Sequence, residues 1–176
     1  KVVPLAEGRV LEVGMGSGLN LKFYDTEKVE LVWGLEPSEG MRRKAARNLK
    51  TAPVEVHWLD LPGEEIPLDD KSADTVMLTY TLCTIPDWQK ALNEMRRVLK
   101  PGGKLVFCEH GEAPDLQVQK WQKRINPVWK KIAGGCNLNR RIPECIESAG
   151  FRIREMDSDY VDGPKFASFE YWGVAK

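Results

Sequence analysis

Apolar runs bounded by turn residues alternate with segments of helical periodicity along most of the chain. Strands have a period of two, or are continuously apolar when both faces are buried, whereas helices repeat their apolar positions every three or four residues. The predicted strands are Arg9–Val13, Glu30–Leu35, Val54–Leu59, Thr75–Thr79, Lys104–Cys108, Phe151–Asp157 and Phe169–Ala175. The predicted helices are a short one near Leu19–Tyr24, then Glu39–Leu49, Trp88–Leu99, Leu116–Ala133 and Arg141–Ala149. This alternation predicts an α/β fold with a doubly wound, mostly parallel sheet and helices on both faces.

Polar residues and a proline-glycine turn mark several of these boundaries. Ser38 is a suitable N-cap for the second predicted helix, and Asp87 for the third. The run Pro101-Gly102-Gly103 predicts a hard stop and a turn before the strand at Lys104–Cys108.

Length and composition indicate one globular domain over residues 1–176. The chain is 42% hydrophobic and 30% charged, and its 26 Lys and Arg residues equal its 26 Asp and Glu residues. No global field therefore attracts nucleic acid, and we expect no nucleic-acid partner. No stretch approaches the roughly 18 apolar residues of a membrane span. The chain begins at Lys1 and reaches a core strand at once, so we expect an N-terminal helical segment to be missing.

The cysteines and histidines suggest no metal site. No pair of cysteines has C-x-x-C spacing, and neither His57 nor His110 lies at ligand spacing from a cysteine along the chain. Scattered cysteines without a secretory signal fit reduced thiols in a cytoplasmic protein. The four cysteines are Cys83, Cys108, Cys136 and Cys145.

A glycine loop follows the first predicted strand. The strand ends in Glu12-Val13, and the loop has glycine at three alternate positions before Asn20, a further candidate for binding the cofactor. A dinucleotide fingerprint needs a glycine where this chain has Leu19, and a P-loop needs a Gly-Lys-Ser/Thr ending. A G-x-G-x-G loop after an acidic residue suits a cofactor without a pyrophosphate, such as S-adenosylmethionine, whose ammonium end Glu12 would favour by charge. The three glycines are Gly14, Gly16 and Gly18.

A second acidic residue, Glu36, stands at the end of the second predicted strand, directly after Leu35. A carboxylate at this strand terminus, about twenty residues beyond the glycines, is placed to accept hydrogen bonds from both ribose hydroxyls. Together with Glu12 and the glycine loop, it indicates an S-adenosylmethionine site. The alternative is a glycine turn and a surface glutamate in an unrelated α/β domain.

From Arg9 onward the sequence resembles the class I S-adenosylmethionine-dependent methyltransferases. Several segments are similar to the type related to ubiquinone and menaquinone biosynthesis, namely Arg9–Gly18, Leu35–Met41, Glu64–Pro86 and Arg96–Glu109. Others are similar to a bacterial subgroup that is like the alkyl thiol methyltransferases of animals, namely Leu82–Asp87, Glu109–Gly111, Asn126–Trp129 and Gly134–Arg140.

The resemblance implies a seven-stranded Rossmann-like sheet with an antiparallel strand near the end of the chain. It implies S-adenosylmethionine as cofactor, held by the three glycines and Glu36. Pro37 and Met41 match residues that line the adenine, and Thr79 matches a position whose backbone carbonyl holds the methionine amine.

One position departs from the family pattern. Relatives of the quinone type place Asp near the adenine amine, where this chain has Pro62 followed by Gly63. Asp60, two residues earlier, is a substitute if the loop shifts. Otherwise backbone groups contact the adenine.

The substrate side is expected around the ends of the fourth and fifth strands. Tyr80, Thr81 and Cys83 follow the fourth strand and are candidates for lining the pocket. His110 directly follows the fifth strand, so it is either a base or substrate hydrogen-bond donor, or a residue that orders the following loop. We favour the second role for His110, and a structural role for His57.

The segment 121–132 carries an apolar stripe of helical spacing among lysines and arginines, beginning at Trp121. We favour packing of this stripe on the sheet edge. The alternatives are a lid over an apolar substrate and an interfacial membrane helix. Cys136 and Asn137 follow this helix and are candidates for closing the substrate pocket, although Asn137 also suits a turn.

Together these features predict transfer of a methyl group from S-adenosylmethionine to a small or lipid-like acceptor. The subgroup resemblance favours a thiol, with a lipid amine or a quinone ring carbon as alternatives. A non-catalytic S-adenosylmethionine-binding module stays open, and Leu19 disfavours a nicotinamide-dependent oxidoreductase. We expect a cytoplasmic protein, with peripheral membrane contact through 121–132 as an option.

Overall fold

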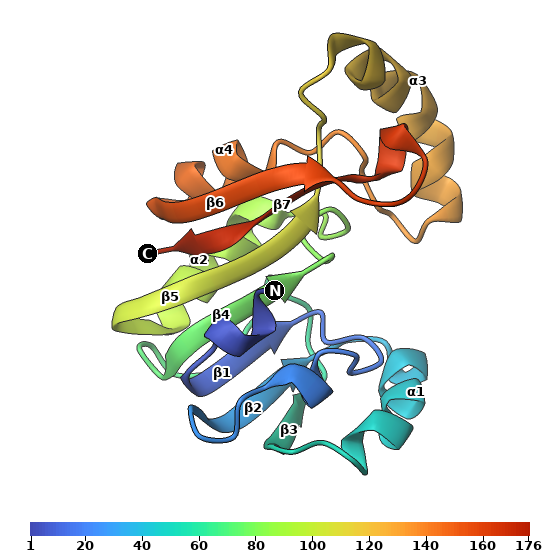
Figure 1. Cartoon of the computed structure of the whole chain (residues 1–176). Coiled ribbons are helices and arrows are strands. Elements are labelled where there is room, and N and C mark those ends of the chain that lie inside the picture. The colour runs from blue at the N-terminus through green and yellow to red at the C-terminus, as the bar shows by residue number, and fades with distance from the viewer.

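A computed structural model of residues 1–176 has a single seven-stranded sheet, drawn in Figure 1. The strand order is β3-β2-β1-β4-β5-β7-β6, and β7 runs antiparallel to both of its neighbours while β1 to β5 are parallel. The predicted α/β fold with its late antiparallel strand is thereby confirmed. The strands are β1 (Gly8–Val13), β2 (Val29–Leu35), β3 (Glu55–Leu59), β4 (Ala73–Thr79), β5 (Leu99–His110), β6 (Ile153–Tyr160) and β7 (Phe169–Ala175).

Four α-helices and three 3-10 turns complete the chain. Ser38 caps the first helix by accepting a hydrogen bond from the Met41 amide at 3.3 Å, and Asp87 caps the second through the Lys90 amide at 3.0 Å. Both predicted caps are confirmed. The elements are α1 (Glu39–Leu49), α2 (Trp88–Val98), α3 (Leu116–Ile132), α4 (Ile142–Ser148), η1 (Val3–Leu5), η2 (Leu21–Phe23) and η3 (Lys165–Ala167).

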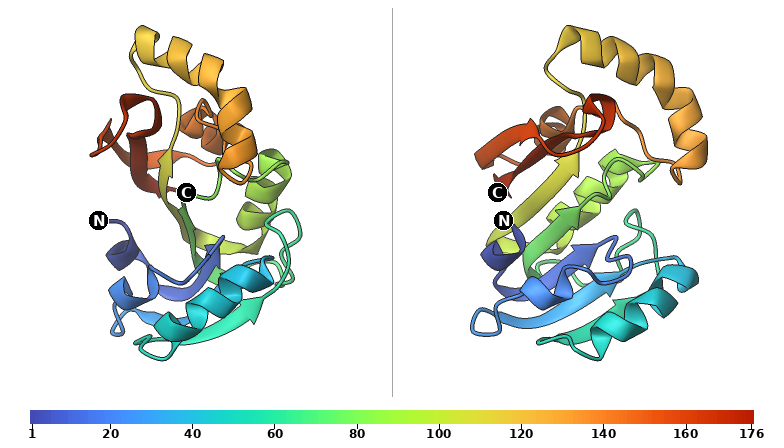
Figure 2. Two further views of the ribbon diagram at one scale, coloured as in Figure 1. Left: turned by 90° about the vertical axis from the view of Figure 1, so that its right-hand side faces the viewer. Right: turned by 45° about the vertical axis from the view of Figure 1, so that its right-hand side comes forward.

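The sheet separates two apolar clusters, one on each face. Figure 2 shows the helices and turns that lie on the two sides of the sheet. The larger cluster joins the strands to α2 and α4, with Met95 and Ile146 fully buried in it. The smaller cluster is covered by the start of the chain, by η1 and by η2, and Leu49 at the end of α1 packs against it. A helix on either face follows from strands that are apolar on both sides.

Two predicted elements differ from the structure. The predicted helix near Leu19–Tyr24 is only the single 3-10 turn η2. The strand predicted to begin at Lys104 begins at Leu99, so β5 includes the Pro101-Gly102-Gly103 run that was predicted as the turn before it. A register irregularity between Ala73 and Thr75 accommodates this run, and Gly102 takes a positive φ of 84°.

The parallel strands end side by side at one edge of the sheet. Val13 of β1 lies opposite Leu35 of β2 and Leu78 of β4, so the loops that follow these three strands meet. This edge, at the strand order reversal next to β1, is where doubly wound sheets bind ligands.

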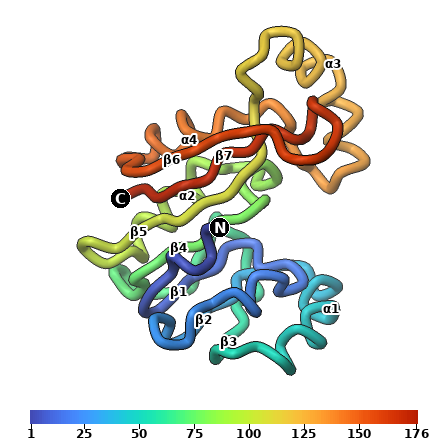
Figure 3. The backbone as a smooth tube through the Cα atoms, in the orientation of Figure 1, coloured from blue at the N-terminus to red at the C-terminus, as the bar shows by residue number.

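Helix α3 stands off the sheet and follows β5 after the connection 111–115 (Figure 3). It contacts η3, where the Trp129 and Phe166 rings meet edge to face with centroids 5.8 Å apart. None of the helices has the length and apolar character needed to cross a bilayer.

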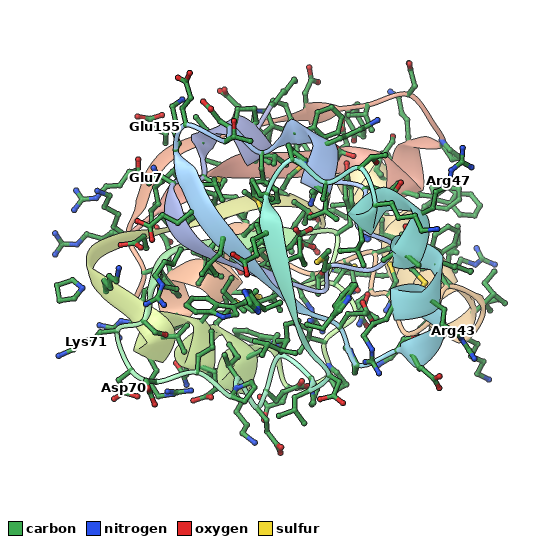
Figure 4. The ribbon with its side chains drawn as sticks, turned by 90° about the horizontal axis from the view of Figure 1, so that it is seen from below. Glu7, Arg43, Arg47, Asp70, Lys71 and Glu155 are labelled. Carbon is green, nitrogen blue, oxygen red and sulfur yellow. The ribbon has the colours of Figure 1, made fainter.

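Charged side chains cover the outside of the fold. Arg43 and Arg47 project from α1, and Asp70 and Lys71 project from the turn before β4 (Figure 4). Arg97 of α2 ties this turn to the helix by donating to the Leu68 and Ile66 carbonyls, each at 2.8 Å. The segment leading from β3 to β4 is therefore held in place.

Candidate active site

A cavity of about 680 Å³ opens at the carboxyl ends of β1, β2 and β4. It lies at the sheet edge where the strand ends converge, and its volume is in the usual range for small-ligand pockets. Its walls come from the segments 13–16, 35–41, 62–64 and 80–86, with Gly134 after α3.

The glycine loop forms one wall through backbone conformations that side chains disfavour. Gly14 and Gly16 have φ values of 69° and 58°. A Cβ on Gly14 would collide with the Thr81 side chain, whereas on Gly16 it would approach Met41 at 3.4 Å. The loop thus brings backbone within reach of a ligand and of the segment after β4.

Glu36 ties the glycine loop to the end of β2. One carboxylate oxygen accepts from the Gly16 amide at 3.0 Å, and the other accepts from the Ser38 amide at 2.8 Å. A carboxylate has about four lone-pair sites, so each oxygen retains acceptor capacity toward the cavity that Glu36 lines. A paired acceptor of this kind fits the two hydroxyls of a ribose.

Glu12 lies behind the glycine loop and not in the cavity wall. Its two oxygens accept from Asn20 Nδ2 at 2.8 Å and from the Tyr24 hydroxyl at 2.9 Å, and Asn20 also donates to Thr79 Oγ1 at 2.9 Å. Burial raises the pKa of Glu12 to about 7. Glu12, Asn20 and Thr79 therefore support the loop from behind, and Gly18 likewise lies outside the lining.

The residues predicted for the adenine side of the site lie in the wall of one cavity. Pro37, Met41, Pro62 and Gly63 all line the cavity, and Asp60 does not. Sequence reasoning missed Glu64, which also lines it.

The loop after β4 is held by residues from distant parts of the chain. Tyr80 lines the cavity with a φ of 50°, and its hydroxyl donates to Glu170. Buried Glu109 accepts from the Thr81 amide at 2.7 Å and the Leu82 amide at 3.0 Å, and burial raises its pKa to about 7. Arg140 donates to the Ile85 carbonyl at 2.9 Å. The sequence around Glu109 and Arg140 does not indicate these supporting roles, because the loop that they hold lies far from both along the chain.

Three potential metal ligands meet next to this loop. The Nε2 of His110 lies 3.1 Å from the Cys136 sulfur, and the ligand atoms of Cys83, His110 and Cys136 all lie within 4.8 Å of one another. Spacing along the chain therefore does not by itself exclude a metal site here, because the fold joins residues that the sequence separates.

Hydrogen bonds within this group polarise it. Those from Cys83 and His110 hold the pKa of the Cys136 thiol well below its usual range, against its partial burial. Burial opposes a charge on His110, but the interaction with Cys136 outweighs it and raises the pKa of the imidazole. His57, by contrast, lies exposed on β3, 2.8 Å from Glu55.

The apolar stripe of α3 does not pack on the sheet edge as predicted. Trp121, Val128 and Ile132 are 57%, 63% and 75% exposed. The buried α3 residue is Gln122, whose side chain accepts from the Ala113 amide and donates to the Gly111 carbonyl, both at 3.0 Å. Helix α3 is therefore attached through Gln122 to the connection after β5, and not through its apolar stripe to the sheet edge.

Two predicted substrate-pocket residues also lie elsewhere. Trp121 borders a separate groove with Val118, Ile125 and Phe166. The Asn137 side chain instead donates to the Cys83 carbonyl at 2.9 Å. Neither residue, nor Cys83, lines the cavity.

The fold and the site together define a class of protein: a Rossmann-like domain that binds a nucleoside cofactor without a pyrophosphate. The model of the methyltransferase domain family matches residues 11–107. The chain belongs to this family of S-adenosylmethionine-dependent methyltransferases, and the family implies S-adenosylmethionine as methyl donor.

Curated relatives refine this placement. The chain is 37% identical over 148 residues to thiol S-methyltransferase TMT1B of Rattus norvegicus, covering 82% of this chain and 60% of the relative. It is 36% identical to the Homo sapiens protein of that name, with 86% and 64% covered. The chain therefore spans somewhat less than two thirds of these relatives. It is also 27% identical to a demethylmenaquinone methyltransferase of Clavibacter sepedonicus, with 97% and 70% covered.

Solved structures share the fold. An S-adenosylmethionine-dependent methyltransferase of Methanosarcina mazei superposes with a TM-score of 0.74 at 17% identity, covering 95% of this chain and 91% of that one.

Proposed function

We propose that this chain transfers a methyl group from S-adenosylmethionine to the sulfur of a small or lipid-like thiol. One observation supports S-adenosylmethionine as the methyl donor. The glycine loop and Glu36 line the same cavity, and the Gly16 amide donates a hydrogen bond to the Glu36 carboxylate. The relatives of 36–37% identity are thiol S-methyltransferases, which supports a thiol as acceptor.

The chain's residues fit this cofactor. The carboxylate of Glu36 would accept from the ribose, and the wall formed by Pro37, Met41 and Pro62 would pack against the adenine. The bound sulfonium supplies an activated methyl group, so the protein has mainly to align the acceptor and exclude water.

A thiol acceptor suits the part of the cavity beside the ends of β4 and α3. Tyr80, Thr84 and Gly134 line it near the ends of β4 and α3. A free thiol has a pKa of about 8.5, so it needs less help from a base than an amine or a ring carbon does. His110 lies outside this lining, and the supported role for it is toward Cys136.

A second acceptor class is favoured by other relatives. Demethylmenaquinone methyltransferases and a phosphatidylethanolamine N-methyltransferase of Cereibacter sphaeroides, 30% identical over 105 residues, act on lipid-like molecules. The exposed apolar face of α3 would bring such a substrate, or a lipophilic thiol, to the domain from a membrane surface.

The test is production of S-adenosylhomocysteine across three acceptors: an alkyl thiol, phosphatidylethanolamine and a demethylated quinone. The proposal predicts turnover with the thiol and none with the other two. Turnover with the quinone or the lipid alone would replace the thiol by that acceptor. Tight cofactor binding without turnover on any of the three would contradict the proposed thiol activity.

A further inference from the structure

The cluster of Cys83, His110 and Cys136 is formed by three separate segments at the carboxyl edge of the sheet. Cys83 follows β4, His110 ends β5, and Cys136 follows α3. Their ligand atoms lie within 4.8 Å of one another, and no fourth His, Cys, Asp or Glu belongs to the group.

We propose that Cys83, His110 and Cys136 form a Zn²⁺ site with three protein ligands, and that its fourth coordination position is left to a small exogenous ligand. In tetrahedral zinc sites, Zn–S and Zn–N bonds of about 2.3 and 2.0–2.1 Å place ligand atoms about 3.5–3.8 Å apart. The 3.1 Å between His110 Nε2 and Cys136 Sγ, within a group that spans at most 4.8 Å, needs only small side-chain rotations to reach that geometry.

The donor set fits zinc better than the common alternatives. Two sulfurs and an imidazole suit Zn²⁺, whereas Mg²⁺ and Ca²⁺ prefer oxygen ligands. Two thiolates and a neutral imidazole would also balance the two charges of the ion. The site is largely shielded, with Cys83 only 2% exposed, so this neutrality removes most of the cost of burying charge.

Neighbouring groups already hold the ligands in position. The Trp129 indole donates to the Cys136 sulfur at 3.3 Å, and the Thr84 hydroxyl lies 3.4 Å from the Cys83 sulfur. The backbone amide and the side chain of Asn137 both donate to the Cys83 carbonyl, at 3.0 and 2.9 Å, which locks the two cysteine loops together. Such contacts from neighbouring groups orient the ligands in metal sites.

A site with three protein ligands is the type that keeps a position for water or substrate. The proposed zinc site adjoins the cofactor cavity along the chain. Thr84, directly after Cys83, and Gly134, two residues before Cys136, both line that cavity. Resting on the proposed function, we assign the fourth position to the acceptor thiol, which would release its proton to solvent as its sulfur binds the ion.

The first test is a metal titration that needs neither cofactor nor turnover. The reduced, metal-stripped chain is titrated with Co²⁺, whose absorption spectrum reports the ligands. A separate titration with Zn²⁺, in competition with a chromophoric chelator, gives the zinc affinity. We expect one equivalent of Co²⁺ with the visible bands of a tetrahedral ion and the near-ultraviolet charge-transfer band of thiolate ligands. Absence of the thiolate band would overturn the site.

Variants assign the ligands. Cys136→Ser and His110→Ala are each expected to weaken Zn²⁺ binding by roughly 100-fold or more, since even outer-shell changes cost 10–100-fold. Cys145→Ser, which removes a buried thiol outside the group, should leave binding unchanged. Circular dichroism and thermal melts of the metal-free variants check that each is folded. Equal zinc affinity in folded Cys136→Ser would overturn the assignment.

The second test concerns the fourth position alone. Adding an alkyl thiol to the Co²⁺ form should intensify and shift the charge-transfer band. An unchanged spectrum in a chain that binds Co²⁺ would overturn the role of the open position. Because methyl transfer is measured separately, with and without Zn²⁺, a failure of the metal site and a failure of the thiol activity are distinguishable.

Discussion

Single residues decide whether the cofactor loop can take its shape. Gly14 has a positive φ and also faces the Thr81 side chain so closely that no Cβ fits, whereas Gly102 has a positive φ of 84° with nothing within 4 Å. A side chain at Gly102 would therefore meet only the cost of the disfavoured backbone conformation, whereas one at Gly14 would also meet a steric clash. Glu36 and Glu109 are the carboxylates that fix the two loops on either side of the cavity.

The pair Gly14→Ala and Gly102→Ala measures that difference. Both variants force alanine into a disfavoured φ, but only Gly14→Ala adds a steric clash. Crowding in a packed site costs about 1–3 kcal/mol, so Gly14→Ala should lower Tm by roughly 2–10 °C more than Gly102→Ala does. Differential scanning calorimetry gives both values, and equal shifts would mean that Thr81 does not restrict the loop.

The pH dependence of stability reports on buried Glu109. Burial raises its pKa from 4.5 to about 7 in the folded chain. The folded state then binds more protons than the unfolded state between pH 4.5 and about 7, so stability falls as pH rises through that window. Buried Glu12, also at about 7, acts in the same direction.

Glu109→Gln should therefore flatten the decline of Tm between pH 5 and 7.5. The slope contributed by one such group is at most about 1.4 kcal/mol per pH unit. Glu39→Gln, which changes an exposed carboxylate on α1, is the matched control. A decline in Glu109→Gln as steep as in the unchanged chain would contradict a protonated Glu109 at low pH.

At the scale of elements, the sequence pattern predicted the features that contacts between nearby residues determine, such as where a helix begins. Helix α1 has the predicted bounds because the Ser38 cap is itself a local contact. The pattern failed in α3, where the apolar stripe is exposed and Gln122 is buried. The partners of Gln122 are backbone groups of the connection after β5 and of η3, which no periodicity in 116–132 can indicate. The meeting of Cys83 with Cys136 likewise depends on the packing of two loops.

The exposed face of α3 predicts binding to a lipid surface. Trp121, Val128 and Ile132 are exposed beside Lys130 and Lys131, a composition typical of interfacial helices. Removing one large apolar side chain from a membrane contact costs about 1.5–3 kcal/mol. Ile132→Ala should therefore weaken binding to anionic phospholipid vesicles roughly 10-fold or more.

Co-sedimentation with vesicles measures this binding. Met156→Ala is the control, since Met156 is 40% exposed on β6, away from α3. Binding that does not respond to Ile132→Ala, or that is absent in the unchanged chain, would leave α3 without a membrane role.

For the whole molecule, the topology converts a linear pattern into a site. The strand order places β1 between β2 and β4, so the glycine loop, Glu36 and the loop after β4 surround one cavity. The alternation of strand and helix patterns was sufficient to predict the mostly parallel sheet, and the family resemblance implied its antiparallel strand. The glycine-glutamate pair could be predicted because both parts lie at strand ends. The sequence was not sufficient to separate the residues that line the cavity, such as Met41, from those that support it, such as Glu12.

The most direct test of the central claim is calorimetric titration of S-adenosylmethionine, and of NAD, into the chain and its Glu36→Ala and Glu39→Ala variants. We predict binding of S-adenosylmethionine but not of NAD. The loss of charged hydrogen bonds in Glu36→Ala should cost about 1.5–3 kcal/mol, roughly 10-fold or more in affinity, with no change in Glu39→Ala. Unchanged binding in Glu36→Ala, or no binding by the unchanged chain, would contradict the assignment of the cofactor site.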